Sequence, residues 1–440
     1  MNTPLKVAII GSGISGLAVA HSLQGCADIS LFEAGSYFGG HTHTVDITLP
    51  NVKGQAVTHG VDTGFLVFNE RTYPNLINLF VELGVQTALS EMSFSVQVPG
   101  ASGRAGRETL EWSGNSLNTV FAQRSNLLNG QFWRMLADLV RFNALVTRLA
   151  HQDRDHDLHQ PLGDFLNANR FSNAFRDWYF LPMLGCIWSC PTDQMLQFPV
   201  STMVRFCHNH GLVQITNRPQ WFTVVGGARN YVEKITAKIH DKRLNTPVQL
   251  IERDVSGVRI VTQGRVERFD KVVIATHSDQ ALALLREPSP LEHDTLSAIR
   301  YQSNRAVLHT DVSVLPKRQS AWAAWNYARA ASGSNSNAST QVCLHYLINR
   351  LQPVPFTQPV VVSLNPIQPI DPRHIHGEFD YAHPVFDMAA LQAQGDMAIL
   401  QGQRHTYYAG AWMGYGFHED GLKAGLGAAR SLLINTPPRG

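Results

Sequence analysis

The residues best suited to chemistry stand near the N-terminus, in the string Gly11-Ser12-Gly13-Ile14-Ser15-Gly16. The glycine spacing is that of a dinucleotide-binding loop. Gly11 permits a tight turn, Gly13 lets the backbone approach a pyrophosphate, and Gly16 lets a helix pack closely on a strand. Glu33, 17 residues beyond Gly16, is an acceptor for ribose hydroxyls. The alternative is a glycine turn that binds nothing, and the flanking elements decide between the two.

Such a loop needs a strand before it and a helix after it. Residues 5–10 predict a short buried strand, and residues 14–23 predict a helix that ends near Gly25. Residues 29–32 predict a second strand, which ends at Glu33. The helix N-terminus would offer N–H groups and the positive end of its dipole to phosphate. This context favours a nucleotide-binding unit over a turn without a ligand.

The acid is followed by Gly39-Gly40-His41-Thr42-His43-Thr44-Val45. With this glycine pair, the sequence resembles the flavin amine oxidase and phytoene desaturase superfamily. It is most similar to a bacterial group of predicted FAD-binding oxidoreductases, whose genes often stand near those of cyclopropane fatty acid synthase. The superfamily usually has Arg where this chain has His41.

Five further segments carry the resemblance, in the same order along the chain. They are residues 61–65 near the flavin ring, 225–229 before the second half of the cofactor domain, 247–250 at the adenine, 270–276 beneath the cofactor, and 408–421 as the C-terminal flavin motif. The resemblance implies an α/β fold, in which a doubly wound, Rossmann-like FAD-binding domain is interleaved with a mixed α+β substrate domain. No second strand, glycine loop and helix unit is found, so no dedicated NAD(P)H domain is expected.

The domains are expected to be discontinuous. The FAD-binding domain is predicted from residues 1–65, 220–285 and 400–440, and the substrate domain from residues 66–219 and 286–399. Local patterns predict a helix over 73–83 between Pro74 and Gly84, a strand pair at 93–98 and 108–112, an amphipathic helix over 130–150, a solvated loop over 151–160, a flexible tip over 331–340 and a last helix over 422–433.

The resemblance also implies which residues contact FAD, which is expected to be held without a covalent bond. They are Gly11, Ser12, Gly13, Ser15, Gly16, Glu33, Ala34, Gly40, His41, Thr42, Gly64, Val248, Ala275, Gly410, Ala411, Asp420, Gly421 and Leu422. No Cys follows Cys343, so no cysteine link is expected at the C-terminal motif. A histidyl link through His41 or His43 stays open.

The catalytic candidates are Tyr415, His418 and Glu419, because they stand in the motif that the resemblance places at the flavin. The competing interpretation is structural. In it His418, Glu419 and Asp420 cap the last helix, with Asp420 as the N-cap.

The substrate is expected to be apolar. Trp412, Tyr415 and Phe417 would line the ring face, where they would wall a pocket for a hydrocarbon, guide an amine, or simply pack in the core. Amine oxidases commonly have a Lys that holds a water at the flavin, and the corresponding segment 304–309 has none. We therefore expect removal of a hydride from a fatty acyl or lipid chain. Amine oxidation is the second interpretation, and a non-catalytic FAD-containing partner of a lipid-modifying enzyme is the third.

Composition excludes other classes. A hydrophobic share of 44% in 440 residues excludes disorder as the main state, and a net charge of +2 argues against a nucleic-acid partner. The scattered cysteines, Cys186 and Cys190 included, match neither a disulfide framework nor a standard metal site. Neither a secretory signal nor a spanning segment is recognised, so the expected location is the cytoplasm, with peripheral membrane contact left open. The exact substrate, electron acceptor, oligomeric state and any catalytic base are not determined.

Overall fold

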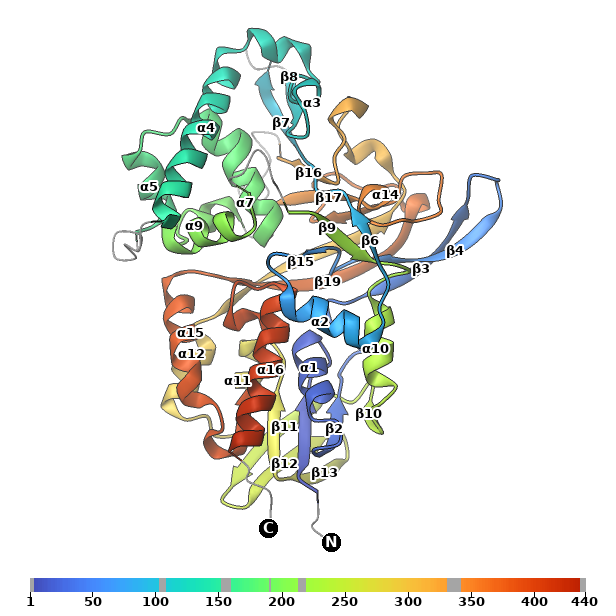
Figure 1. The fold of residues 1–440 in the computed structure, drawn as a ribbon, viewed down its shortest axis with the longest axis vertical. Coiled ribbons are helices and arrows are strands. Elements are labelled where there is room, and N and C mark those ends of the chain that lie inside the picture. Colours follow the sequence, from blue (N-terminus) through green and yellow to red (C-terminus); the bar gives the residue numbers. More distant parts are fainter. Residues whose placement is uncertain are drawn as a thin grey trace.

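A parallel sheet forms the centre of the lower lobe, at the bottom of Figure 1. The computed structural model describes residues 4–102, 108–151, 160–189, 191–212, 219–330 and 342–435. The sheet has the order β10-β2-β1-β14-β20, and every neighbouring pair is parallel. Its strands are β1 (Lys6–Ile10), β2 (Asp28–Phe32), β10 (Asp241–Arg243), β14 (Lys271–Ile274) and β20 (Thr406–Tyr408). This is the strand order of a doubly wound dinucleotide-binding fold, and the predicted α/β class is confirmed.

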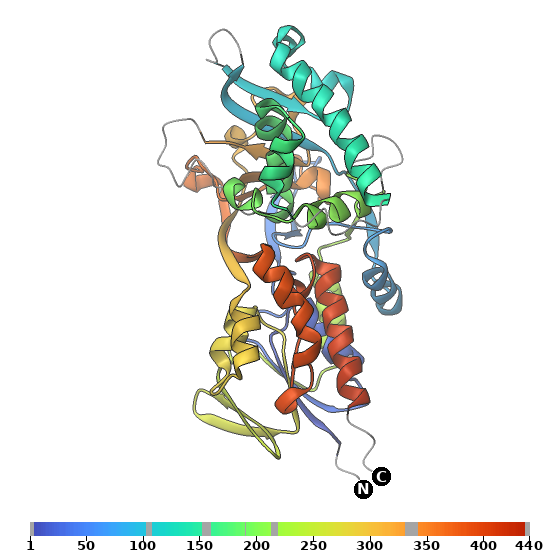
Figure 2. The same ribbon diagram turned by 90° about the vertical axis from the view of Figure 1, so that its left-hand side faces the viewer.

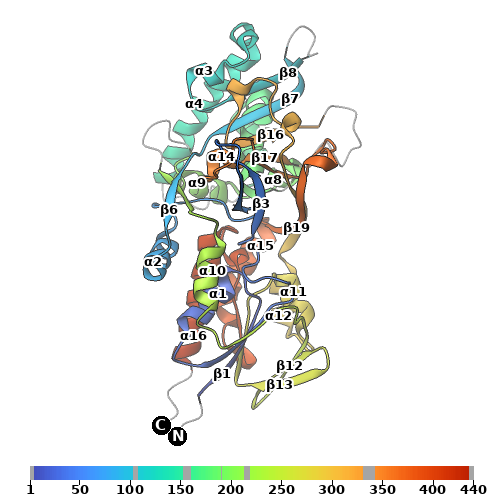
Figure 3. The ribbon, with the colours of Figure 1, turned by 90° about the vertical axis from the view of Figure 1, so that its right-hand side faces the viewer.

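Both faces of this sheet are covered, which explains why β1 is a continuous apolar run. Val7 and Ile9 point into one core, and Ala8 and Ile10 into the other. The first core is closed by α1 (Ile14–Ser22), α2 (Pro74–Leu83), α10 (Arg229–Thr236) and α16 (His418–Ile434), with α1 and α10 side by side in Figure 3.

The second core lies under a three-stranded antiparallel sheet and three helices. They are β11 (Val248–Asp254), β12 (Gly257–Thr262), β13 (Arg265–Phe269), α11 (Ser278–Leu284), α12 (Pro290–Ser297) and α15 (Met388–Leu400). Helices α12 and α15 pack here although their residues fall in the range predicted for the substrate domain. The domain boundaries themselves stay a prediction.

A mixed seven-stranded sheet forms the upper lobe, in the order β19-β15-β18-β17-β16-β7-β8. Its strands are β7 (Phe94–Ser102), β8 (Glu108–Ser113), β15 (Arg300–His309), β16 (Trp325–Ala328), β17 (Cys343–Leu347), β18 (Val361–Leu364) and β19 (Ile375–Val385). Only the β16–β7 pair is parallel, so the topology differs from that of the lower lobe.

Helices cover this sheet on the outer side of the molecule, as Figure 2 shows for the long helix α4. They are α4 (Gly130–His151), α5 (Leu162–Ala168), α7 (Leu181–Trp188) and α9 (Val200–Asn209), joined by shorter helical turns. Their apolar sides share one core with the sheet. No described helix is long and apolar enough to cross a membrane.

Several local predictions are confirmed. Helix α2 has Pro74 in its first turn and ends at Gly84, whose φ of +61° suits glycine. β7 and β8 form the expected antiparallel pair, and α4 is the expected amphipathic helix. One prediction is wrong: the last helix begins at His418 rather than at Leu422. The predicted loop at 151–160 lies almost wholly outside the described residues, and the predicted tip at 331–340 lies entirely outside them.

Candidate functional site

The glycine loop is closed on one side and open on the other. A Cβ added at Gly16 would lie 1.9 Å from the Gly11 carbonyl oxygen, and one at Gly11 would lie 2.7 Å from that of Ala275. Gly11 also has a φ of +96°, which other residues rarely adopt. A Cβ at Gly13, by contrast, meets no atom within 4 Å. The loop is therefore packed against β14 but leaves the space beside Gly13 open, as a pyrophosphate requires.

Glu33 stands at the end of β2 and holds the loop in place. Its Oε2 accepts hydrogen bonds from the backbone N–H of Ser12 at 3.0 Å and from the Ser12 hydroxyl at 2.5 Å. Its Oε1 accepts from the N–H of Gly35 at 2.8 Å. Ala34, between them, is exposed. The carboxylate thus lies at the C-terminal end of the strands, where a doubly wound sheet binds its ligand.

The second glycine pair lies directly against this loop. Gly39 donates its N–H to the Ser12 carbonyl at 3.1 Å, and a Cβ at Gly40 would lie 3.2 Å from the Gly13 Cα. A Cβ at Gly64 would lie 2.2 Å from the His41 carbonyl oxygen, so that segment is packed here as well. Three predicted cofactor segments therefore meet at one place.

His41 projects from this junction into a cluster of rings. Its centroid lies 5.0 Å from that of Tyr381, 5.4 Å from that of His383 and 6.2 Å from that of His277. Burial, followed by repulsion from the imidazoles of His383, His277 and His418, lowers the pKa of His41 to about 3. Its Nε2 is buried and has no hydrogen-bond partner among the described residues. A buried polar atom without a partner is costly, so this atom fits a ligand with hydrogen-bonding oxygens.

Sequence reasoning missed His277 and His383. His383 stands on β19, where Phe379, Tyr381 and His383 alternate along one face; this period of two was the available signal. Asn304 of β15 binds the Nδ1 of His383 through its Nδ2 at 2.9 Å. This amide thus lies in the segment where amine oxidases, by the resemblance, commonly have their lysine.

The start of α16 is built differently from the prediction. Phe417 is the N-cap, and Asp420 sits in the first turn. Its Oδ2 accepts the N–H groups of Phe417 at 3.0 Å and Tyr415 at 3.1 Å. Burial raises the pKa of Asp420 to about 6. Asp420 is therefore the reciprocal partner of the cap, not the N-cap.

Small residues bring this helix end against α1. A Cβ at Gly421 would lie 2.8 Å from Ile14, 3.0 Å from the Ser15 hydroxyl and 3.5 Å from Ala411. Leu422 is buried in the same core. Gly410 follows β20 in an extended conformation, with its Cβ position filled by the Trp412 ring. The N-termini of α1 and α16 therefore lie close together at the C-terminal ends of the parallel strands.

His418 is held by aromatic neighbours. Its Nε2 lies 2.7 Å from the Tyr231 hydroxyl, which in turn lies 2.5 Å from the Thr42 hydroxyl. Its ring stacks on Phe65 at 3.9 Å between centroids. Burial lowers the pKa of His418 to about 3, so the imidazole is neutral. The candidate catalytic histidine is thus linked through Tyr231 to the segment that follows His41.

Hydrogen bonds and burial disagree with the predicted roles of Glu419 as a catalytic residue and of Trp412 as a residue that lines the ring face. Both Glu419 oxygens bind the start of α2: Oε1 accepts from the Asn75 N–H at 3.0 Å and from its Nδ2 at 2.6 Å, and Oε2 from the Leu76 N–H at 3.0 Å. Glu419 is therefore a helix cap rather than a catalytic group. Trp412 is buried in the second core of the lower lobe, where its Nε1 donates to the Thr276 carbonyl at 3.1 Å, so it does not line an open face.

Tyr415 and Phe417 do line a cavity, of about 500 Å³, between the starts of α2 and α16 and the end of α9. The Phe417 ring stacks on Phe206 at 4.9 Å, and the Tyr415 ring meets Phe206 edge-on at 6.2 Å. Trp188 donates its Nε1 to the Tyr415 carbonyl at 3.3 Å. Phe206, Tyr415 and Phe417 thus form a cluster of aromatic rings next to the cavity. Arg71 and Lys423 also line this cavity.

The remaining candidates lie outside this centre. The Val248 side chain is buried at the start of β11, where Val248 pairs with Thr262 of β12, so its contact with a ligand stays a prediction. Among the described residues no group of His, Cys, Asp or Glu is placed to hold a metal. Cys186 and Cys207 are buried, and Cys190 lies outside the described residues.

Comparisons with known proteins agree with this arrangement. A crystal structure of a fatty acid isomerase from P. acnes that produces CLA has 17% identity, a TM-score of 0.67, and coverage of 98% of this chain and 100% of the other. Cyclohexylamine oxidase from Brevibacterium oxydans IH-35A has 17% identity, a TM-score of 0.66, and coverage of 98% and 99%. Putrescine oxidase bound to putrescine has 16% identity, a TM-score of 0.66, and coverage of 98% and 100%. None of the curated protein sequences matches the chain.

The family comparison covers most of the chain. The profile of the flavin containing amine oxidoreductases matches residues 14–348. The open side of Gly13, the junction at Gly40 and the unpartnered His41 Nε2 all fit a bound FAD. The chain therefore belongs to the flavin-containing amine oxidoreductase family and is an FAD-dependent oxidoreductase.

Proposed function

We propose that this oxidoreductase acts on an apolar chain, most simply a fatty acid or fatty acyl group, rather than on an amine. The observation that carries the proposal is the cavity beside the C-terminal motif, to whose lining Tyr73, Tyr415 and Phe417 contribute aromatic rings. An alkyl chain gains about 0.8 kcal/mol for each CH₂ that it buries there.

The charges of the cavity support an acid over an amine. A charged ammonium needs a carboxylate partner when it is buried. Of the carboxylates that line the cavity, Glu419 gives both oxygens to α2, and Asp420 turns Oδ2 to two backbone N–H groups. Arg71 and Lys423 balance these two carboxylates in the lining, and their cationic groups can pair with the carboxylate of a fatty acid.

The described side chains bind and orient the substrate. The bound FAD supplies the acceptor for a hydride. Loss of this hydride and of a proton from the neighbouring carbon leaves a double bond in the chain. Tyr415 and Phe417 would fix the chain by van der Waals contacts, since the chain offers few polar groups. Tyr415 and His418 stay the predicted catalytic residues.

The test is anaerobic reduction of the bound flavin, followed by its loss of absorbance. We expect long-chain fatty acids or acyl esters to bleach the flavin, and diamines and simple amines to leave it oxidised. Fast bleaching by an amine alone would replace the proposal with amine oxidation. Tightly bound FAD that no lipid or amine reduces would favour a non-catalytic partner.

A variant pair locates the substrate. Phe417→Ala should lower the efficiency of flavin reduction by a long chain about tenfold or more, and the loss should grow with chain length. Phe222→Ala removes a comparable ring that stacks on Phe68 in the lower lobe, and it should leave this efficiency unchanged at equal FAD content. Equal losses in both variants would contradict a substrate cavity at Phe417.

A further inference from the structure

The outward face of α4 carries an apolar stripe. Trp133, Ala137, Val140 and Ala144 are exposed and follow the spacing of one helical face. Trp133 is 49% exposed and Val140 is 57% exposed. The opposite face of the helix is fully buried in the core that the helices of the upper lobe share with its sheet. Its residues there are Phe132, Met135, Phe142 and Val146. The helix is therefore apolar on two sides, and only one of them is covered.

A second stripe, of arginines, runs beside the first. Arg134, Arg141 and Arg148 are seven residues apart and all exposed. Asp138, buried beneath them, binds Arg141 at 3.0 Å and Arg134 at 3.5 Å. Residues 117–151 hold four arginines, one aspartate and no lysine or glutamate, which makes a net charge of +3. The whole chain has a net charge of only +2, so positive charge is concentrated here.

The turns that precede α4 expose two further apolar side chains. Leu117 begins α3 (Leu117–Val120) and is 80% exposed, and Leu128 ends the turn η2 (Arg124–Leu128) and is 93% exposed. Trp133 donates its Nε1 to the Leu127 carbonyl at 2.9 Å, which ties this turn to the helix. In Figure 1 these elements lie at the upper end of the molecule, far from both termini.

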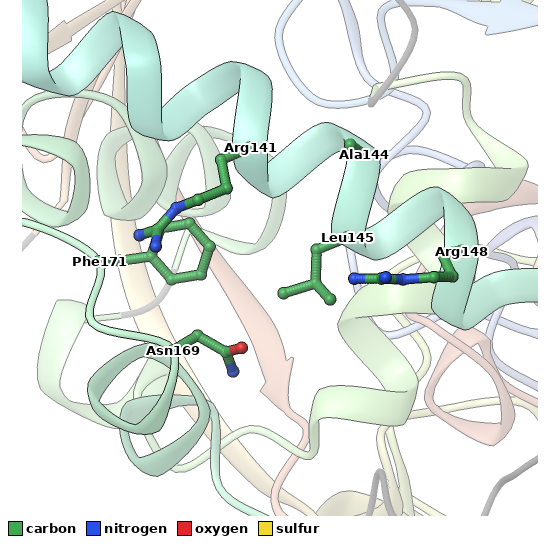
Figure 4. A pocket seen from close by; sticks show the side chains of 6 residues that line it. All are labelled: Arg141, Ala144, Leu145, Arg148, Asn169 and Phe171. Carbon is green, nitrogen blue, oxygen red and sulfur yellow. The ribbon is translucent and has the colours of Figure 1, made fainter.

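A cavity of about 400 Å³ lies next to the arginine stripe. Figure 4 shows the Arg141 guanidinium over the Phe171 ring, 4.2 Å from its centroid, and Arg148 across from it. Arg141 also donates to the Arg170 carbonyl at 3.0 Å. Ala144 and Leu145 complete the lining together with Asn169. The cavity therefore combines two guanidinium groups with apolar walls, a combination suited to a phosphate group with an attached chain.

We propose that the outward face of α4, with α3 and η2, docks on the surface of an anionic phospholipid membrane. Leu117, Leu128 and Trp133 enter the headgroup boundary, and Arg148 binds a lipid phosphate. Arg134 and Arg141, which also contact Asp138, add to the positive charge that attracts the anionic surface. Exposed leucines at a protruding end together with an arginine stripe are the features of an interfacial helix. A neutral protein partner would explain the leucines but not the arginines. Such docking places the enzyme at a source of acyl chains, but it does not depend on which substrate the flavin site takes.

The test is co-sedimentation of the FAD-loaded enzyme with vesicles. We expect binding to phosphatidylglycerol–phosphatidylethanolamine vesicles and little binding to phosphatidylcholine vesicles, with a loss of binding at high salt. Arg148→Ala should weaken vesicle binding by roughly fivefold, as expected for one arginine at an anionic surface. Leu128→Glu should weaken it more, because it removes apolar area and adds a negative charge.

A matched control keeps the test specific. Val255→Glu places the same charge on a valine that is 99% exposed in the lower lobe, and it should leave vesicle binding unchanged. Fluorescence of Trp133 should be quenched by brominated lipids, and Trp133→Phe should abolish that component. Equal binding to both vesicle types, or equal loss in Leu128→Glu and Val255→Glu, would overturn the proposal. So would a dimer in solution that Leu128→Glu dissociates while vesicles bind neither form.

Discussion

Binding of FAD is expected to take up a proton at His41. Burial and the imidazoles of His383, His277 and His418 lower the pKa of this ring to about 3, so without an anion it is neutral. Gly40 packs on Gly13, which places His41 next to the open side of the loop where the pyrophosphate is expected. A bound pyrophosphate would stabilise the charged imidazolium. The usual Arg of this superfamily is charged at every pH, whereas His41 becomes charged only when an anion is bound and the pH is low enough to protonate the imidazole.

Linkage sets the size and the sign of the effect. If the anion returns the pKa of His41 from about 3 to its ordinary value of about 6.5, FAD should bind about 30-fold more tightly at about pH 5 than at about pH 8. This ratio corresponds to ~2 kcal/mol. Because binding raises the pKa, the gain grows as the pH falls below about 6.5 and is lost as the pH rises through that value.

Fluorescence titration of the apoprotein with FAD across this pH range measures the effect, and calorimetry in two buffers of different ionisation enthalpy counts the protons. His41→Arg should bind FAD with an affinity that does not depend on pH, and His41→Gln should bind weakly throughout. His59→Gln, on the β3–β4 hairpin (Thr44–Pro50 and Ala56–Asp62), should keep the native slope. The reasoning is refuted if the native protein and His41→Arg show the same slope, or if no proton is taken up.

Three more predictions follow from single contacts. Gly13→Ala should change the stability of the apoprotein by at most about 1 kcal/mol, because the added Cβ meets no protein atom. The same Cβ would occupy the space expected for the pyrophosphate, so FAD titration should show much weaker binding. In Gly16→Ala the Cβ falls 1.9 Å from a carbonyl oxygen, and calorimetry should show a lower Tm even without FAD. Burial lowers the pKa of His309 to about 4 and of His345 to about 3. Their contribution to stability is full above the unfolded value of about 6.5 and falls by ~2 kcal/mol each at about pH 5. His345→Gln should reduce the loss of stability between neutral pH and about pH 5. If the urea midpoints at these two pH values differ as much in His345→Gln as in the native protein, the linkage is contradicted. Glu419→Ala should cost about 2 kcal/mol and leave the rate of flavin reduction nearly unchanged; a large rate loss at native stability would return this residue to the catalytic group.

The nucleotide-binding half could be predicted because its signals are local. The apolar run of β1, the spacing of Gly11, Gly13 and Gly16, and Glu33 at the end of β2 depend on backbone sterics and on neighbours a few residues away. The same holds for α2 between Pro74 and Gly84, and for the apolar side of α4. Steric limits on φ and ψ and the helical period act within a few residues, so the amino-acid sequence determines them without knowledge of the rest of the fold.

The roles of side chains at the site were decided by tertiary structure. Glu419 looked like a site residue until α2 brought Asn75 to one of its oxygens and Leu76 to the other. Trp412 looked like a residue lining the site until the Thr276 carbonyl accepted its N–H inside a core. His383 drew no attention because it reaches His41 only after β19 pairs with β15. The partners in each case lie more than a hundred residues apart. The burial, hydrogen bonding and pKa of a side chain depend on whichever distant segments pack against it, and only the folded chain brings those segments together.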